Sequence, residues 1–261
     1  MRIVMKKAEP TLNFAELRSK ALEVHERLCA VYGCPISFFH DHDPLSELVS
    51  ALLSHRTRNA DSGHAFKELR KRFGDWETVR DAPVEDVQDA IARCTWPEQK
   101  APRIQQVLRE VAKSGDGEMS LEFLRDMPVK DARAWLEALP GVGPKTSAAV
   151  LVFSDLRMPA LPVDSHHHRV AARLGLIPSG LPVGPSHAVL ESFLPDDWST
   201  QQVYDHHEVF MLHGQRCCFF HNPACRRCPL LDICPTGQER GEKPEKVKVG
   251  EIAATSAARD E

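Results

Sequence analysis

The chain has 261 residues, 42% of them hydrophobic, and a formal net charge of −4 at pH 7. This length suits one large or two modest domains with a sizeable core, and the negative charge argues against broad, nonspecific affinity for polyanions. The chain starts Met1-Arg2-Ile3-Val4 without an apolar signal segment, and no apolar run is long enough to span a membrane. We therefore expect a cytoplasmic protein whose cysteines stay reduced.

Hydrophobic spacing predicts helices along most of the chain. Apolar residues from Phe14 to Val31 recur every three or four positions, which predicts an amphipathic helix ending at Gly33. Asp43-Pro44 is expected to cap a second helix. Further helices are predicted near 59–73, 83–93, 98–113, 128–138, 145–154, 166–174, 186–193 and 200–213. Because alternating strand patterns are nearly absent, the predicted fold is all-α, with a disordered tail over 237–261.

A glycine-containing turn lies between two of these helices. In Leu139-Pro140-Gly141-Val142-Gly143-Pro144 the two glycines allow a tight turn whose N–H groups approach a phosphate. Lys145 follows on the first helical turn, where the helix dipole favours a neutral, nucleophilic amine. Asp164 comes nineteen residues later, and an amine with a nearby carboxylate suffices for Schiff-base chemistry. A non-catalytic helix-hairpin-helix that only grips DNA is the alternative interpretation.

Four cysteines near the C-terminus have the spacing of a ligand set. Cys218, Cys225, Cys228 and Cys234 form C-x₆-C-x₂-C-x₅-C. This asymmetric spacing fits a [4Fe–4S] cluster better than a zinc site made of two close-spaced pairs, and the cluster is expected to be structural. Cys217 could compete with Cys218, although the spacing favours Cys218. The remaining thiols, Cys29, Cys34 and Cys94, are interpreted as ordinary buried cysteines rather than disulfides.

The hairpin, the lysine, the aspartate and the cysteine loop, in this order, resemble the endonuclease III family of base-excision DNA glycosylases over roughly residues 14 to 236. The resemblance implies that Lys145 is the nucleophile, that Asp164 is the catalytic carboxylate and that the four cysteines bind an iron–sulfur cluster. It further implies a bifunctional glycosylase and AP lyase that removes damaged bases, with oxidised pyrimidines expected, from double-stranded DNA. Two domains should flank a DNA-binding cleft: a helical bundle over 37–158, and a cluster domain made of 1–36 plus 159–236. We expect a monomer.

Two departures from the family pattern affect the predicted DNA contacts. The family typically reads Leu-Leu-Ser-Ala-Gln-Thr, with the glutamine filling the gap left by the extruded base, and Arg56 stands at that glutamine position here. Trp96 stands where a wedge into the opposite strand is expected. With the hairpin residues Gly141, Val142 and Gly143, and with His166 two positions after Asp164, these residues are the predicted DNA contacts. The departures leave open an enzyme that acts mainly as an abasic-site lyase or on few lesions; a non-catalytic DNA-binding protein is the other alternative.

Overall fold

The computed structural model describes residues 12–114, 118–241, 243–244 and 252, and this part of the chain contains helices and no strand. The predicted all-α fold is therefore confirmed. Short 3₁₀ turns occur at Glu122–Asp126, Cys225–Arg227 and Leu231–Ile233. The helices are α1 (Phe14–Tyr32), α2 (Pro44–Ser54), α3 (Asn59–Phe73), α4 (Trp76–Asp81), α5 (Val84–Ala90), α6 (Pro97–Ser114), α7 (Val129–Glu137), α8 (Pro144–Phe153), α9 (Ser165–Arg173), α10 (Val183–Glu191), α11 (Thr200–Arg216) and α12 (Pro235–Glu239).

The helix ends follow local chemistry. Gly33 ends α1 in the left-handed region at φ 86°, which glycine adopts without steric cost, and the Asp43 side chain accepts a hydrogen bond from the Ser46 N–H at the start of α2. Both boundaries were predicted. Helix α4 was not, because it has only six residues and buries only Trp76 and Val79.

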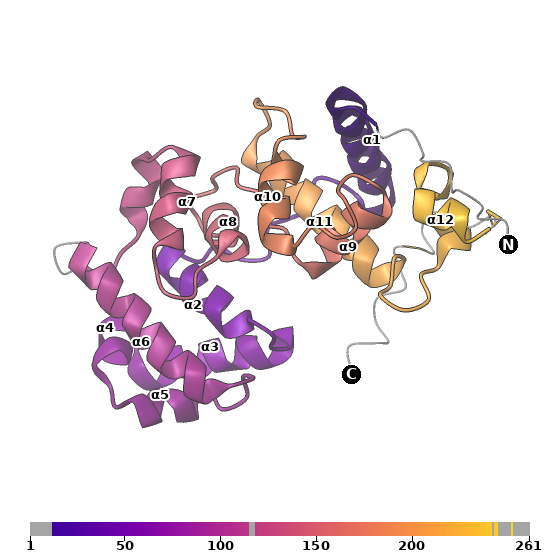
Figure 1. Ribbon diagram of the computed structural model, residues 1–261. Helices are drawn as coiled ribbons and strands as arrows, with labels where there is room; N and C mark the ends of the chain where they lie inside the picture. The colour runs from indigo at the N-terminus through magenta and orange to yellow at the C-terminus, as the bar shows by residue number, and fades with distance from the viewer. Residues whose placement is uncertain (1–11, 115–117, 242, 245–251, 253–261) are drawn as a thin grey trace, which may run out of the picture.

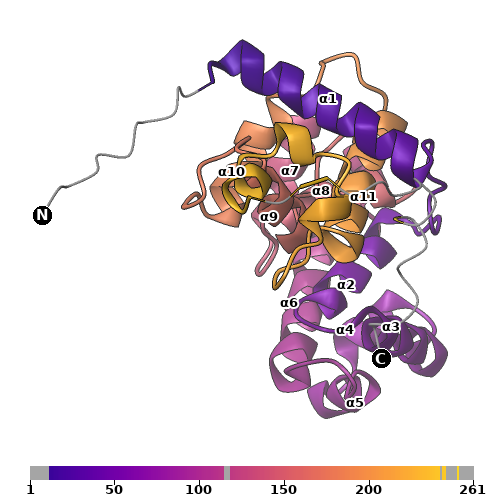
Figure 2. The ribbon, with the colours of Figure 1, turned by 90° about the vertical axis from the view of Figure 1, so that its right-hand side faces the viewer.

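Two hydrophobic cores divide the molecule. One contains buried residues between Leu45 and Ala160, and the other combines residues of α1 with residues from Leu161 to Leu230. Helices α3 to α6 gather at one end of the ribbon, and α1 and α12 lie at the other (Figure 1). In the rotated view α1 runs along the top of the second group, over α11 (Figure 2), with which it is in contact. The predicted domain limits remain a prediction.

A smaller apolar cluster joins the two cores. Ala149, Val152 and Phe153 of α8 pack against Tyr204 of α11. Because α8 begins at the hairpin and α11 packs against α9, this contact sets the distance between the two helix N-termini that carry Lys145 and Asp164.

Two expectations about the chain need correction. Cys29 and Cys34 are joined in a disulfide, with Cα atoms 5.0 Å apart, because the left-handed Gly33 turns the chain back over the last turn of α1. Cys94 is a buried free thiol, as predicted. The predicted disordered tail is also wrong in part: residues 237–239 belong to α12, and Ile252 is buried in one cluster with Cys217. The rest of that tail lies almost wholly outside the described residues.

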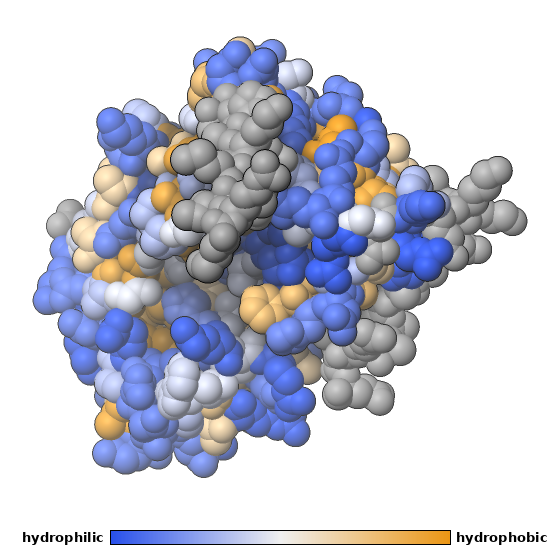
Figure 3. All heavy atoms as spheres, turned by 45° about the vertical axis from the view of Figure 1, so that its right-hand side comes forward, coloured by the Kyte–Doolittle hydropathy of each residue, from blue (hydrophilic) through white to orange (hydrophobic). Residues whose placement is uncertain are grey.

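The surface is mostly hydrophilic on the face shown in Figure 3, where hydrophobic side chains form small, separated groups. Among the described residues, no helix combines the length and the apolar character that crossing a membrane requires.

Candidate active site

The hairpin between α7 and α8 contains the two glycines. Gly141 has φ +82°, which favours glycine, and a Cβ atom there would lie 2.5 Å from Nη1 of the Arg103 side chain, which would have to move. Gly143 is extended, caps α8, and has open space where a Cβ atom would lie. Val142 is 7% exposed and packs into the first core, while its N–H bonds to the Leu139 carbonyl. Val142 therefore stabilises the hairpin by its packing and by its backbone hydrogen bond.

Lys145 is the second residue of α8 and is partly buried. Burial lowers the pKa of its amine below the usual value, while the negative charges of Asp164 and Glu47 act in the opposite direction. Burial is thus the main reason why the neutral amine is favoured. The helix dipole, on which the sequence argument rested, acts in the same direction.

Asp164 is held in place from three sides. It is the N-cap residue of α9, and its Oδ1 accepts a hydrogen bond of 2.7 Å from the His167 N–H. Nε2 of His187 accepts a bond of 3.1 Å from the Val163 N–H. Nδ1 of His207 lies 2.8 Å from the Pro162 carbonyl oxygen. Two buried histidines, which the sequence analysis did not identify, therefore hold the backbone of the two residues that precede Asp164.

A cavity of about 740 Å³ lies between the two helix N-termini. Its lining joins both cores, because α2, α6 and α8 contribute from one side and residues 163–165 with Val183 from the other. Among the predicted site residues, Lys145, Asp164, Gly141, Arg56 and Trp96 line it. The full lining is Leu52, Ser54, His55, Arg56, Trp96, Gln99, Lys100, Arg103, Ile104, Gly141, Lys145, Val163, Asp164, Ser165 and Val183.

His166, Val142 and Gly143 are not part of this lining. Nδ1 of His166 lies 3.1 Å from Nη2 of Arg169, and its Cβ packs close to Gly214 of α11. Successive helical residues point about 100° apart, so His166 turns away from the direction of Asp164. The DNA contact predicted for His166 remains a prediction.

Arg56 and Trp96 lie side by side at the rim of the cavity. Their positive φ angles of 51° and 55° are uncommon for non-glycine residues. The Arg56 guanidinium carbon lies 6.0 Å from the centroid of the Trp96 ring, and Trp96 is 47% exposed. Thr95 ties the two loops together, since its Oγ1 donates to the Arg56 carbonyl and its N–H donates to Oγ1 of Thr57.

Lys100 anchors the loop that carries Arg56. Its Nζ donates to the carbonyl oxygens of Leu53 and His55, at 2.6 and 2.7 Å, and to Oγ1 of Thr57 at 2.7 Å. The two carbonyls lie at the C-terminal end of α2, where helical carbonyls lack intrahelical partners. Lys100 thereby holds the loop in its unusual backbone conformation.

Two further titratable residues lie near Lys145 and Asp164. His55 places its Nε2 2.9 Å from Oγ1 of Thr146, and burial together with the charges of Lys145 and Lys100 lowers its pKa to about 4. His55 is therefore neutral at pH 7. The sequence analysis did not select His55 as a site residue, although it directly precedes Arg56. Burial, with the charges of Asp164 and Asp205, raises the pKa of Glu208 to about 7; no motif indicated this residue.

Hydrogen bonds and ion pairs of α7 also connect the hairpin to the second core. Ser147 Oγ of α8 donates to Oε1 of Glu137, the last residue of α7, at 2.7 Å. Arg133 lies 3.7 Å from Glu137 and 2.5 Å from Glu191, and Glu191 accepts from the Leu161 N–H. This network attaches the segment that leads to Asp164 to helix α7.

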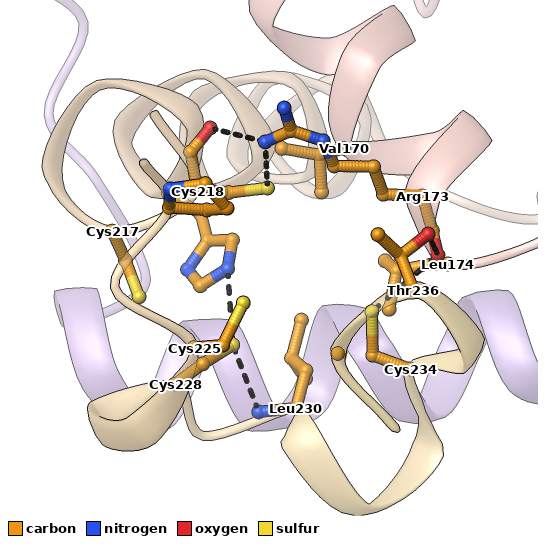
Figure 4. Close-up of a pocket in the computed structure, with 13 residues that line it drawn as sticks. Val170, Arg173, Leu174, Cys217, Cys218, Cys225, Cys228, Leu230, Cys234 and Thr236 are labelled. Atoms are coloured by element: carbon orange, nitrogen blue, oxygen red, sulfur yellow. Dashed lines mark hydrogen bonds between the residues drawn. The ribbon is translucent and has the colours of Figure 1, made fainter. Parts of the chain in front are cut away.

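The four predicted cysteine ligands line one cavity (Figure 4). All are free thiols, and the rest of the lining combines apolar side chains with the polar side chains of Arg173, His213 and Thr236. Burial raises the pKa of Cys218, Cys225 and Cys234, and a hydrogen bond with Cys217, followed by burial, raises that of Cys228. N–H groups approach two of the sulfur atoms: Arg173 donates to Cys218 at 3.3 Å, and the Leu230 N–H donates to Cys228 at 3.4 Å.

Cys217 lies in the same lining as a fifth thiol. It is buried, and its Sγ can donate to the Ala224 carbonyl at 3.7 Å. Ligand atoms of Cys217, Cys228 and His213 also lie within 4.8 Å of one another. Geometry alone therefore leaves open the competition between Cys217 and Cys218.

Comparison with known proteins identifies relatives across most of the chain. Residues 49–187 match the HhH-GPD superfamily of base excision DNA repair proteins. Endonuclease III of Thermotoga maritima is 32% identical over 201 residues, which cover 77% of this chain and 86% of that protein. Endonuclease III of Bacillus subtilis is 31% identical over 202 residues, covering 77% and 85%. The structure of an endonuclease III trapped as a covalent intermediate with DNA has the same fold, with a TM-score of 0.72 and 24% identity, and the match covers 88% of this chain and all of that one.

Proposed function

The chain belongs to the endonuclease III family of HhH-GPD base-excision DNA repair proteins and is a DNA glycosylase/AP lyase, and from this premise we propose that Lys145 is its nucleophile and Asp164 its catalytic carboxylate. The observation that carries the proposal is the cavity that both side chains line from different lobes. The lowered pKa of the Lys145 amine supports it, because only the neutral amine is nucleophilic.

The chemistry follows from this pair. A base inside a duplex is out of reach, so its nucleotide must rotate into the cavity, at a cost of a few kcal/mol. Asp164 stabilises the positive charge that develops on the sugar as the C1′–N bond breaks and the base leaves with the bonding electrons. The Lys145 nitrogen bonds to C1′ and loses a proton, and ring opening gives a Schiff base. Removal of a C2′ proton then expels the 3′ phosphate by β-elimination.

Arg56 and Trp96 are proposed to keep the duplex open. Their position at the rim of the cavity, on two loops tied by Thr95, suits residues that enter the space left by the extruded nucleotide. An arginine can bond to the orphaned base or to a phosphate, and an indole ring can stack on a base. These residues therefore act on base extrusion rather than on bond cleavage.

We propose oxidised pyrimidines in double-stranded DNA as the substrates and a monomer as the active form. The basis is the resemblance to the endonuclease III family, to which relatives named endonuclease III belong. Arg56 and Trp96 favour one second candidate, an enzyme that acts mainly on abasic sites or on few lesions, because both positions that fill the gap are altered.

A [4Fe–4S] cluster fits the cysteine cavity. Cys218, Cys225, Cys228 and Cys234 surround one space, and the donors from Arg173 and Leu230 would reach the sulfur atoms that carry the negative charge. Burial disfavours free thiolates there, whereas ligation stabilises them. When bound, the cluster supplies structural cross-links; the chain's own residues carry out the glycosylase chemistry.

Borohydride trapping tests the proposal. The wild-type protein should form a covalent adduct with a duplex that contains an abasic site, and Lys145→Ala and Lys145→Gln should form none while still binding that duplex. Asp164→Asn should slow base removal strongly and retain slow cleavage of abasic sites, because an amide neither stabilises the developing cation nor accepts the amine's proton. Lys67→Ala, at an exposed position of α3, is the control and should match the wild type.

The same assay on a panel of duplexes identifies the substrate. The panel contains thymine glycol, dihydrouracil, a uracil mismatch, 8-oxoguanine and an abasic site. Trapping of the first two at rates close to that of the abasic site would support the oxidised-pyrimidine proposal, and trapping of the abasic site alone would support the second candidate. An adduct with Lys145→Ala would show that the nucleophile is another residue.

A further inference from the structure

A second group of potential metal ligands lies away from the cysteine loop, where the connector between α1 and α2 meets α2. His40 and His42 belong to the connector, and Glu47 lies in the first turn of α2. Nε2 of His40 is 3.1 Å from Oε2 of Glu47, and Nδ1 of His42 is 3.5 Å from the same oxygen. One ligand atom from each of the three side chains lies within 4.8 Å of the others.

These two distances lie within about 0.2 Å of the edges of a metal coordination tetrahedron. Zinc binds imidazole nitrogen and carboxylate oxygen at about 2.0–2.2 Å, which places adjacent ligand atoms of a tetrahedron roughly 3.3–3.5 Å apart. Two imidazoles and one glutamate are also a known zinc ligand set with an open fourth position. The side chains of His40 and His42 are 20% and 30% exposed, so a water molecule can fill that position and an ion can enter.

Three polar atoms of this group make no hydrogen bond of acceptable geometry with any described residue. Among the described residues, Oε2 of Glu47 and Nδ1 of His40 and of His42 are buried without a hydrogen bond of acceptable geometry. The Glu47 side chain is only 5% exposed. Burying a carboxylate oxygen without a hydrogen bond is costly, and a bound cation would remove that cost for Oε2 of Glu47 and would give Nδ1 of His42 a partner.

The backbone holds the two imidazoles before any ion binds. The Arg157 guanidinium donates to the His40 carbonyl at 3.0 Å, and the Asp155 N–H donates to the His42 carbonyl at 2.9 Å. The two rings stack on each other with centroids 3.8 Å apart. The charge of Arg157 is partly compensated, because the guanidinium pairs with Asp41. The donor set is therefore preorganised.

We propose that His40, His42 and Glu47 bind a divalent transition-metal ion of borderline softness, with Zn²⁺ as its probe. Two imidazole nitrogens favour such an ion over Ca²⁺ or Mg²⁺, which prefer oxygen ligands. The ion fixes the connector to the start of α2, and hence fixes the segment that joins α1 of the second core to the helices of the first. The alternative is a plain ion pair between Glu47 and a protonated histidine, without affinity for metal.

Zinc binding to the iron-loaded, full-length protein tests the proposal. After incubation with an excess of zinc and dialysis, the wild type should retain about one zinc ion per chain beyond its iron content. His40→Ala and His42→Gln should lose this ion at unchanged iron content. His64→Ala, at an exposed histidine of α3, is the matched control and should retain it. Zinc should raise the melting temperature of the wild type and of the control, but not that of the two variants.

X-ray absorption at the zinc edge of the wild type gives a result that does not depend on whether a variant folds. Nitrogen and oxygen scatterers at roughly 2.0–2.1 Å, with no sulfur, would support the site. A sulfur shell at about 2.3 Å would place the zinc in the cysteine loop and overturn the proposal. Absence of retained zinc, or equal retention by His42→Gln, would overturn it as well.

Discussion

Replacing Lys100 by methionine separates opening of the duplex from bond cleavage. Methionine keeps the aliphatic bulk of the side chain but removes the ammonium group, and with it the hydrogen bonds to Leu53, His55 and Thr57. The loop then loses the group that joins the end of α2 to Thr57. Arg56, whose φ is positive, should leave its present conformation.

The size of the effect follows from the three bonds. A hydrogen bond to a charged group contributes about 1.5–3 kcal/mol, so the lower end of that range gives about 4.5 kcal/mol for all three. The freed carbonyls can be hydrated, and burial lowers the pKa of Lys100, which means that its charge pays a desolvation penalty in the native state. We therefore expect a loss of about 2 kcal/mol in the free energy of unfolding.

Two assays check this prediction. Urea unfolding followed by circular dichroism should show the stability loss for Lys100→Met and none for Lys67→Met. In single-turnover kinetics, Lys100→Met should act about tenfold or more slowly on a paired lesion, because ~1.4 kcal/mol corresponds to a factor of ten. It should be nearly unimpaired on a single-stranded abasic site. Equal losses on both substrates would show that Lys100 serves the chemical step, and the positioning argument would fail.

Three further predictions concern the cluster, the nucleophile and the wedge. Cys218→Ser should lose iron and visible absorption, whereas Cys217→Ser should keep both; the reverse outcome would assign the ligand to Cys217. Because burial lowers the pKa of Lys145, the rate of borohydride trapping on an abasic site should rise with pH and level off below pH 10.5, and a midpoint at the ordinary lysine value would contradict a buried amine. Trp96→Ala should slow the reaction on paired lesions by about tenfold to a hundredfold, since stacking contributes ~1–3 kcal/mol per base, while sparing single-stranded abasic sites.

Most of the helices could be predicted because their signals are local, and Lys145 and Asp164, which the sequence analysis proposed as the catalytic residues, line one cavity. The spacing of apolar residues in α1 is visible without any tertiary information, and Gly141 is required by its own backbone angle. Arg56 and Trp96 could be recognised as replacements within a familiar pattern. Their contact could not, because it depends on Thr95 joining two loops that are forty residues apart.

The features that could not be predicted from the sequence form where distant or reversed segments of the chain come together. The Cys29–Cys34 disulfide needs the left-handed turn at Gly33, and five-residue spacing alone does not indicate it. His40, His42 and Glu47 converge only when the connector has been fixed by Arg157, which lies more than a hundred residues later. Such groups are assembled by tertiary contacts and have no periodic signature.

His187 connects stability, pH and catalysis. Its Nδ1 lies 3.0 Å from the Val183 carbonyl and must donate, so the neutral ring presents an unprotonated Nε2, which accepts the Val163 N–H. Protonation would place an N–H group at Nε2 against the Val163 N–H. Burial lowers the pKa of His187 and so also disfavours protonation.

A histidine pKa that is lower in the folded state means that the unfolded chain binds more protons below about pH 6.5, so stability should fall as pH decreases through that range. His187→Leu should remove this part of the pH dependence. It should also destabilise the protein by about 1–3 kcal/mol, because the Val163 N–H is left buried without an acceptor, and it should slow base removal by displacing Asp164. In His187→Gln the Oε1 atom can replace Nε2 as acceptor, so this variant should recover most of the activity without the titration. If leucine and glutamine were equally active, the bond to Val163 would not position Asp164.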